Sequence, residues 1–571
     1  MSTASLPYHE PGIVTILIHT SFLLLLNIGN FVLDHTLYCG LLGQIFLGIA
    51  WGTPGAKWLT TEIEEVIVQL GYLGLLLIVY EGGLSTSLKA IKANLLLSSC
   101  VATTGIALPI GLSFALLKLC GATPLQSFAA GAALCSTSLG TTFTVLGSTG
   151  LIQARLGVVL TSAAMMDDVV GLIMVQVISN LGSSGMSISA VTIVRPLLVS
   201  VAFAVCAPLV CVFVAKPITL WLNSIRTKHP LGFLNRCLTK DRTAWIIHTL
   251  ILLGCVAAST YAGTSNLFAA YIAGAGISWW DSEVPHPELN VASTAVSTAV
   301  PTTAQVQAQT TESPTANGTE IPEHSDQNTE GSNLSGLGTF EKYYSQPLHR
   351  ILRPFFFASI GFSIPITEMF NSTIVWKGLV YTVLMIIGKM ACGVWLLRIA
   401  FTPSISIMCT KFTTTVKLLR PKITNLWSQA HEKSTPSRTT THTRQNQPPN
   451  SSSSQQTRST RAATETSDPT SIKPRSVYPA SILGCAMTAR GEIGFLISSV
   501  AESNMIFSSE KSLGGKNSEI FLVVTWAIML CTILGPLAVG LIVRRVEQLQ
   551  QGAQRQGRFV RGDVLGVWGL S

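Results

Sequence analysis

The stretch AAMMDDVVGLIM, Ala163 to Met174, is apolar enough to lie in a lipid bilayer, yet it contains two adjacent acids, Asp167 and Asp168. Charges at membrane depth cost at least about 2.5 to 3.5 kcal/mol each on insertion scales and usually mark an ion or proton path. Neighbouring residues on a helix point about 100° apart, so the two carboxylates face different surroundings. The alternative, a structural acid paired with a cation elsewhere in the bundle, is the less frequent case. We therefore expect a functional pair.

The composition of the whole chain indicates a membrane protein. Of its 571 residues, 48% are hydrophobic and only 11% are charged, whereas a soluble globular domain carries roughly 25% charged residues. Apolar runs long enough to cross a bilayer as helices, about 20 residues each, recur along nearly the whole length. A β-barrel would instead alternate apolar and polar residues. The first run, from Gly12, has no basic region before it and no cleavage pattern, so we expect a retained helix.

We predict an all-α polytopic protein with about 13 transmembrane helices. The seventh run could be one tilted helix or two short ones, and the ninth is short for a full crossing. The expected spans lie near residues 12–33, 38–58, 65–85, 93–120, 124–150, 155–181, 188–222, 243–265, 266–280, 346–370, 373–401, 477–506 and 518–543.

Two hydrophilic segments interrupt the spans. Residues 281–340 contain eight carboxylates and no Lys or Arg, whereas residues 402–475 contain eleven Lys or Arg against three acids. Both are expected to be disordered, because neither has enough apolar surface to offset the entropy lost on ordering. The expected organisation is a first membrane region 1–280, an acidic loop 281–340, spans 10 and 11 in 341–401, a basic cytoplasmic linker 402–475, spans 12 and 13 in 476–546, and a C-terminal tail 547–571.

The basic flanks decide the expected orientation. Positive charge on both sides of the 402–475 segment predicts that it is cytoplasmic. Asn317-Gly-Thr and Asn333-Leu-Ser match the glycosylation pattern of an external loop, but this pattern is common by chance and acids contribute little to orientation. We therefore expect the N-terminus outside and the C-terminus, after Arg544 and Arg545, inside.

Polar residues interrupt two further spans. In AALCSTSLGTTFTVL the interrupting residues are Ser136, Thr137, Ser138, Gly140, Thr141 and Thr142; in CAMTARGEIGFLI they are Thr488, Arg490, Gly491, Glu492 and Gly494. Broken helices at corresponding places in two halves point to a transporter site. The fifth and twelfth spans are seven apart, so they cross in opposite directions, as an inverted repeat requires. Chance polar clusters are the alternative.

The eleventh span adds a cation at membrane depth. Lys389 lies in VLMIIGKMACGVW with no neighbouring charge in its own helix, so it needs a partner. The nearest supply of intramembrane carboxylate is the pair Asp167 and Asp168, although a lone Lys near a helix end is sometimes structural. Glu81, at the end of the third span, is expected to be structural.

Taken together, these motifs resemble the monovalent cation:proton antiporter superfamily, the sodium/proton exchanger fold. The resemblance covers the membrane region in order, and the two long hydrophilic insertions depart from the common pattern. The motifs are Y-E-G-G-L-S, C-S-T-S-L-G-T-T, the D-D pair, R-P-F-F-F-A-S-I-G-F-S, the lone Lys389 and T-A-R-G-E-I-G.

The resemblance implies a fold with inverted repeats, in which two unwound helices cross beside the carboxylates. It implies that a dimerisation domain is joined by a long linker helix, here the seventh span, to a mobile core, and that the protein is a homodimer. It further implies that Asp168 carries the cation and the proton, that Asp167 pairs with Lys389, and that Thr137 and Ser138 lie at the crossing. Arg490 and Glu492 match the charged signature of the second broken helix.

We therefore expect an antiporter that exchanges a monovalent cation, Na⁺ or Li⁺ foremost, for protons. An Asp-Asp pair is associated in that family with electrogenic exchange, so two protons per cation are expected, with the acids titrating as a coupled unit. K⁺/H⁺ exchange on the same fold is the nearest alternative. The expected partners are these ions and the lipid bilayer, with no cofactor, no resident metal and no nucleic acid. The plasma membrane and an internal vacuolar or endosomal membrane are both compatible with the sequence.

Two other classes fit less well. An intramembrane aspartic protease needs its two acids on different helices, typically with a G-x-G-D stretch, and here the acids are adjacent and that stretch is absent. A receptor on an inactive transporter fold predicts loss of an acid or of Lys389, yet all are present. We therefore expect no enzymatic activity.

Overall fold

A computed structural model describes the membrane part of the chain. It covers residues 8, 10–86, 94–138, 151, 154–183, 190–229, 232–238, 240–284, 335–397, 477–508, 518–555, 565 and 568. The basic segment 402–475, the body of the acidic segment with Asn317 and Asn333, and Gly140, Thr141 and Thr142 lie outside the described residues. Residues 1–396 and 476–571 belong to one compact unit, called the first unit below.

The described residues form helices and turns, with no strand among them. The helices of the first half are α1 (Ile13–Leu37), α2 (Gly40–Trp51), α3 (Thr61–Leu84), α5 (Leu95–Ser113), α6 (Leu116–Leu119), α7 (Pro124–Ala133), α9 (Arg155–Ser183), α10 (Ala190–Val210), η1 (Cys211–Ala215), α11 (Lys216–Lys228), α12 (Phe233–Leu238), α13 (Asp241–Ala262) and α14 (Asn266–Glu283). Those of the second half are α16 (Gly336–Phe340), η2 (Glu341–Ser345), η3 (Leu348–Leu352), α17 (Arg353–Phe362), α18 (Ile366–Met369), α19 (Ser372–Met390), η4 (Ala391–Leu396), α21 (Tyr478–Ala486), α22 (Glu492–Ser503) and α23 (Glu519–Arg555).

The expectation of an all-α polytopic membrane protein is confirmed. Within the described ranges, eight helices are long and apolar enough to cross a membrane. Helix is found in each of the thirteen expected spans, but several of these helices are short or broken, so the number thirteen stays a prediction. The seventh span is one continuous helix, Val194–Lys228, made of α10, η1 and α11, and not two.

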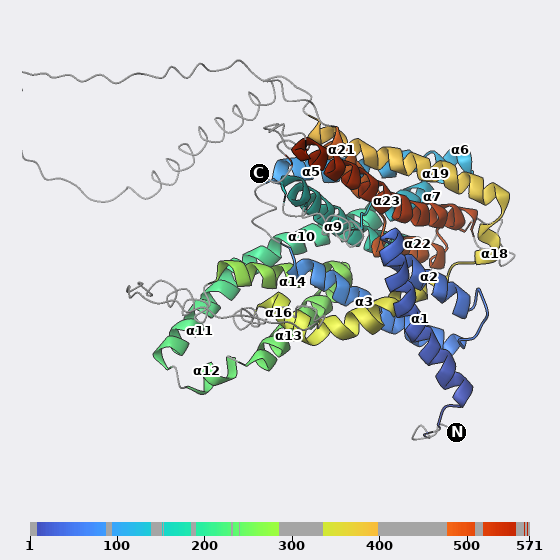
Figure 1. The fold of residues 1–571 in the computed structure, drawn as a ribbon. Helices are drawn as coiled ribbons and strands as arrows, with labels where there is room; N and C mark the ends of the chain where they lie inside the picture. The colour runs from blue at the N-terminus through green and yellow to red at the C-terminus, as the bar shows by residue number, and fades with distance from the viewer. Residues whose placement is uncertain are drawn as a thin grey trace, which may run out of the picture. The chain divides into compact units, whose positions relative to one another are not determined.

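The helices of the first unit pack in two groups, which Figure 1 shows one above the other. One group contains α5, α7, α9, α19, α21, α22 and α23, and the other contains α1, α2, α3, α13, α14, α16 and α17. The helix α10 contacts α9 of the first group and α14 of the second. It therefore lies where the expected linker helix would lie.

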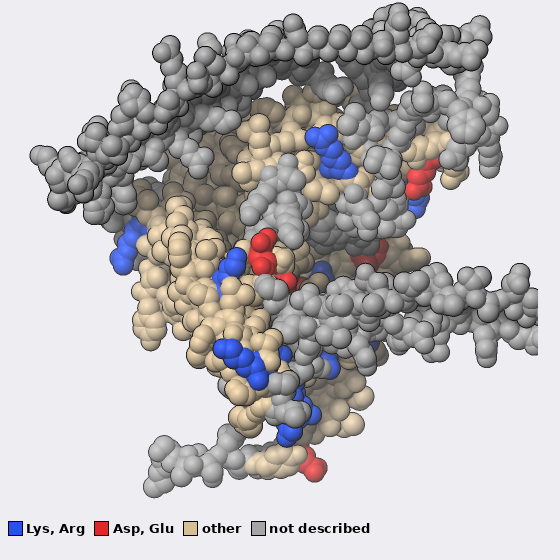
Figure 2. Space-filling model, turned by 90° about the vertical axis from the view of Figure 1, so that its left-hand side faces the viewer, with Lys and Arg blue, Asp and Glu red and all other residues tan. Residues whose placement is uncertain are grey.

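The surface is poor in charge, as a bilayer requires. Figure 2 shows only scattered Lys, Arg, Asp and Glu among uncharged residues on the face in view. Large apolar side chains are exposed along α10, η1 and α11, among them Phe213 and Trp221. Lipid satisfies such side chains as well as a protein core does, so this exposure carries no cost in a membrane.

Glycines let α3 approach α17 closely. A Cβ atom on Gly71 would lie 2.8 Å from the Phe356 Cα, and one on Gly74 would lie 2.6 Å from the Leu352 carbonyl oxygen. Both neighbours are backbone atoms, which cannot move aside as the end of a flexible side chain could. Small residues at helix contacts are a general means of bringing backbones together in membranes.

We expect Gly74→Ala to destabilise the protein by about 1–3 kcal/mol, because the added methyl group overpacks the contact of α3 with η3 and α17. Thermal unfolding of the purified protein in detergent measures the effect. The matched control is Gly82→Ala in the same helix, where an added Cβ meets nothing within 4 Å and the gain in helix propensity is favourable. An equal loss of stability in both variants would contradict this packing.

Candidate functional site

Two helices are interrupted in the first helix group. Regular helix α7 ends at Ala133 and the chain continues as an unwound segment through Ser138. Similarly, α21 ends at Ala486 and α22 begins at Glu492, which leaves residues 487–491 unwound. These are the two places where hydroxyl residues, glycine and charge interrupt the apolar sequence. Such residues compete with helical hydrogen bonds through their side chains.

The two unwound segments cross and bond to each other. The Ser138 backbone N–H donates to the Ala489 carbonyl oxygen at 2.9 Å, and the Thr137 hydroxyl donates to the Met487 carbonyl oxygen at 3.3 Å. A Cβ on Gly491 would lie 2.7 Å from the Ser138 Cβ, so glycine is required for the close approach. The crossing therefore pairs backbone groups that neither helix satisfies internally.

Two buried cations bond to the carbonyls that follow α7. Lys389, on α19, donates to the Cys135 carbonyl oxygen, and Arg490 donates from Nη1 to the Ser136 carbonyl oxygen at 2.7 Å. The C-terminus of a helix presents unpaired carbonyls and the negative end of its dipole, which favour nearby positive charge. The N-terminus of a helix has the opposite, positive end of the dipole and favours an acid. Glu492 lies there, in the first turn of α22.

Asp167 is fully buried and paired. Its Oδ2 accepts from Lys389 Nζ at 2.8 Å and from the Thr137 hydroxyl at 2.6 Å. Lys389 also donates to the Thr137 Oγ1 at 2.9 Å, and both charged side chains have no exposed surface. Asp167 Oδ1 is buried without a hydrogen-bond partner among the described residues. The two buried charges of Asp167 and Lys389 thus compensate each other, and most of their hydrogen-bonding atoms have a partner.

Asp168 has a different environment. It is partly exposed, and its Oδ1 accepts from the Ser136 hydroxyl at 2.9 Å. No Lys or Arg forms an ion pair with it within the described part of the chain. One turn further along α9, Gly171 lets Ser136 pack closely against the helix, because a Cβ on Gly171 would lie 2.9 Å from the Ser136 Cβ. The two adjacent acids therefore differ in exposure, in partners and in charge compensation.

The structure brings the predicted site residues together and adds Ser136 to them. Thr137, Asp167, Lys389 and Arg490 surround the crossing, and Ser138 contributes its backbone N–H. The hydroxyl that contacts Asp168 belongs to Ser136, which sequence reasoning noted only as part of the polar run. No group of three or more His, Cys, Asp and Glu suited to a metal occurs among the described residues.

This arrangement defines a class of protein: a multi-pass integral membrane protein with two broken helices that cross beside paired acids. The solved sodium proton antiporter MjNhaP1 of Methanocaldococcus jannaschii has the same fold, with a TM-score of 0.51 at 12% identity, covering 93% of this chain and 98% of that one. The transmembrane model of the sodium/hydrogen exchanger family matches residues 23–295, a little under half of the chain, and this region is similar to that family. The resemblance inferred from the sequence motifs is confirmed.

Two curated relatives are also similar to part of this chain. The high-affinity Na⁺/H⁺ antiporter NhaS3 of Synechocystis is 27% identical over 219 residues, which is 38% of this chain and 47% of that protein. The probable Na⁺/H⁺ antiporter GerT of Bacillus cereus is 28% identical over 251 residues, which is 43% of this chain and 61% of that protein. The chain thus matches about half of the length of these relatives.

We expect Lys389→Ala to destabilise the protein by about 3–5 kcal/mol, because it leaves the buried Asp167 carboxylate uncompensated. Its matched control is Lys377→Ala in the same helix, which breaks a partly exposed pair with Glu519 and should cost about 1 kcal/mol or less. Thermal unfolding measures both. The double variant Asp167→Asn with Lys389→Ala should recover part of the loss, since no unpaired charge remains. An unchanged melting temperature for Lys389→Ala would refute the assignment.

Proposed function

We propose that the protein is a secondary antiporter that exchanges a monovalent cation, Na⁺ or Li⁺ foremost, for protons across its membrane, and that it is not an enzyme. The observation that carries the proposal is the contrast between the adjacent acids. Asp167 is compensated by Lys389 and closed off, whereas Asp168 is partly exposed and bonded to a hydroxyl. Only the second is partly open to solvent and has no Lys or Arg paired with it among the described residues, so it can exchange one positive ligand for another.

In the proposed mechanism, a proton and a cation compete for Asp168. Hard cations prefer oxygen ligands, and the Ser136 hydroxyl and the backbone carbonyls of the unwound segments supply more of them beside the carboxylate. The ionised, empty site is costly to move through an apolar barrier, whereas the protonated and the cation-loaded forms are not. Net movement of either ion is therefore coupled to movement of the other.

Asp167 sets the charge moved per cycle in this mechanism. If the pair with Lys389 opens when the cation binds, a second proton is exchanged and transport is electrogenic, which is the form we propose. One extra charge per cycle makes transport respond to voltage by about 2.3 kcal/mol per 100 mV. K⁺/H⁺ exchange at the same acids is the alternative, and a homodimer is the proposed assembly.

We expect Asp168→Asn to abolish exchange while folded protein remains in the membrane, because the amide cannot bind and release a proton. The measurement is proton flux into liposomes of purified protein after addition of Na⁺, Li⁺ or K⁺, with and without a clamped membrane potential. Glu519→Gln is the control, since this acid pairs with Lys377 away from the crossing. Normal flux in the Asp168 variant would refute the proposal, and the best cation and the response to voltage identify the substrate and the stoichiometry.

A second variant tests the hydroxyl. We expect Ser136→Ala to raise the cation concentration for half-maximal exchange about tenfold or more, because the variant loses an oxygen beside the carboxylate and an interaction of a polar group with a charged one contributes roughly 1.5–3 kcal/mol. Ser127→Ala is the matched control, as this buried hydroxyl on the preceding helix has no hydrogen-bond partner among the described residues. Equal affinities in the two variants would exclude Ser136 from the cation site.

A further inference from the structure

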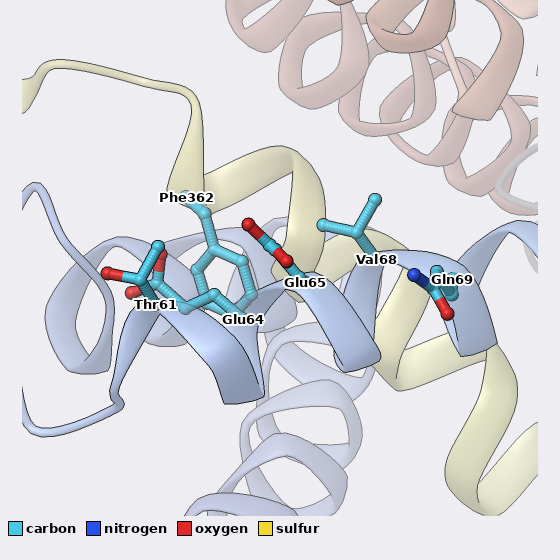
Figure 3. A pocket seen from close by; sticks show the side chains of 6 residues that line it. All are labelled: Thr61, Glu64, Glu65, Val68, Gln69 and Phe362. Carbon is cyan, nitrogen blue, oxygen red and sulfur yellow. The ribbon is translucent and has the colours of Figure 1, made fainter. Parts of the chain in front are cut away.

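A pocket lies away from the paired acids, between the first turns of α3 and the end of α17. Its volume is about 320 Å³, and it is lined by Thr61, Glu64, Glu65, Val68, Gln69 and Phe362 (Figure 3). None of the candidate transport residues lines it. A volume of this order is at the lower end of the range for small-molecule sites, roughly 300–1,000 Å³, and it exceeds what a single inorganic ion fills.

One carboxylate that lines the pocket is buried and incompletely bonded. Glu64 is 8% exposed. Its Oε2 accepts from the Thr53 hydroxyl at 2.7 Å, whereas Oε1 is buried with no hydrogen-bond partner among the described residues. No Lys, Arg or His of the described residues forms an ion pair with Glu64. A buried acceptor of this kind is costly unless a donor reaches it. A cationic N–H group would supply a donor and would also offset a negative charge on the carboxylate.

The rest of the lining favours a cation that has an apolar body. Figure 3 shows the Phe362 ring between the side chains of Thr61 and Glu65, with Val68 one turn further along α3. An aromatic face attracts cations as well as apolar groups, and Glu65 adds a second carboxylate to the lining. A metal ion fits less well, because the described residues offer no metal-ligand cluster.

We propose that this pocket binds a small organic cation, with an ammonium or guanidinium group on Glu64 and its apolar part against Phe362. The site is separate from the transport acids, and its existence does not depend on the proposed antiport. The occupant is defined by its chemistry: one N–H-bearing positive charge on a compact apolar body.

The test is calorimetric titration of the full-length purified protein in Na⁺-free buffer with phenethylammonium, compared with phenethyl alcohol. The alcohol has the same body without the charge and corrects for partition into detergent. We expect saturable binding of the ammonium only, weakened tenfold or more by Glu64→Gln. Glu62→Gln is the matched control: it removes the same charge from the same helical turn, but Glu62 is exposed and does not line the pocket.

Several outcomes would overturn the proposal. These are no saturable binding, equal binding of the alcohol, or the same Glu64-dependent heat with NaCl alone, which would indicate an inorganic cation site. Binding that is lost in Asp168→Asn but kept in Glu64→Gln would place the probe at the transport acids instead. If Glu64→Gln does not fold, Phe362→Leu decides, because it removes the aromatic wall: we expect weaker binding of the ammonium, and unchanged affinity would refute the site.

Discussion

The buried contact between Lys389 and Asp167 is the interaction on which the site depends. Lys389 reaches three acceptors at once: the Asp167 carboxylate, the Thr137 hydroxyl and the Cys135 carbonyl. It thereby joins α19, α9 and the end of α7 at a single charge. An unwound segment inside a membrane has backbone groups that lipid cannot satisfy, and here the lysine meets part of that requirement. The same contact that neutralises an acid also stabilises the interruption of the helix.

The remaining charges follow the polarity of the helix ends. Arg490 bonds to a carbonyl beyond α7, and Glu492 starts α22. Two buried nitrogens of Arg490, Nε and Nη2, have no hydrogen-bond partner among the described residues. This region therefore contains more hydrogen-bond donors than the described acceptors satisfy. Asp168 has no ion pair with a Lys or Arg among the described residues. The site therefore places a compensated acid, Asp167, directly beside an acid that no ion pair compensates.

Much of this site could be predicted from residue types. A lone lysine at membrane depth needs an acid, and the pair Asp167 and Asp168 was the nearest supply of intramembrane carboxylate, so the cost of an unpaired charge favoured a contact of Lys389 with one of them. Which of the two acids it would contact did not follow from the residues and came only from the family resemblance. Likewise, the polar run predicted the interruption of α7, but not that Ser136 would bond to Asp168. That assignment depends on the backbone path after Ala133, which has no helical periodicity to indicate side-chain directions.

The fold was predictable to a similar degree. Apolar runs of sufficient length marked the helical segments, because a bilayer demands internally satisfied backbone. The continuity of the seventh span was not predictable, since two prolines, Pro196 and Pro208, lie inside it and prolines often break helices. The pocket beside Glu64 had no signal either, as TEIEE at a helix start is also typical of an ordinary interfacial turn.

The continuous helix Val194–Lys228 has a mechanical consequence. Its 35 residues give a length of about 52 Å, whereas the hydrocarbon core of a bilayer is about 30 Å thick. The C-terminal part of the helix, α11, contains Lys216, Arg226 and Lys228, so this part can extend beyond the hydrocarbon core, and the apolar remainder adjusts its tilt to the thickness of the bilayer. Because the same helix contacts both helix groups, its tilt links the spacing of these groups to the thickness of the surrounding lipid. A change in membrane thickness would therefore change how the two helix groups are arranged around the paired acids.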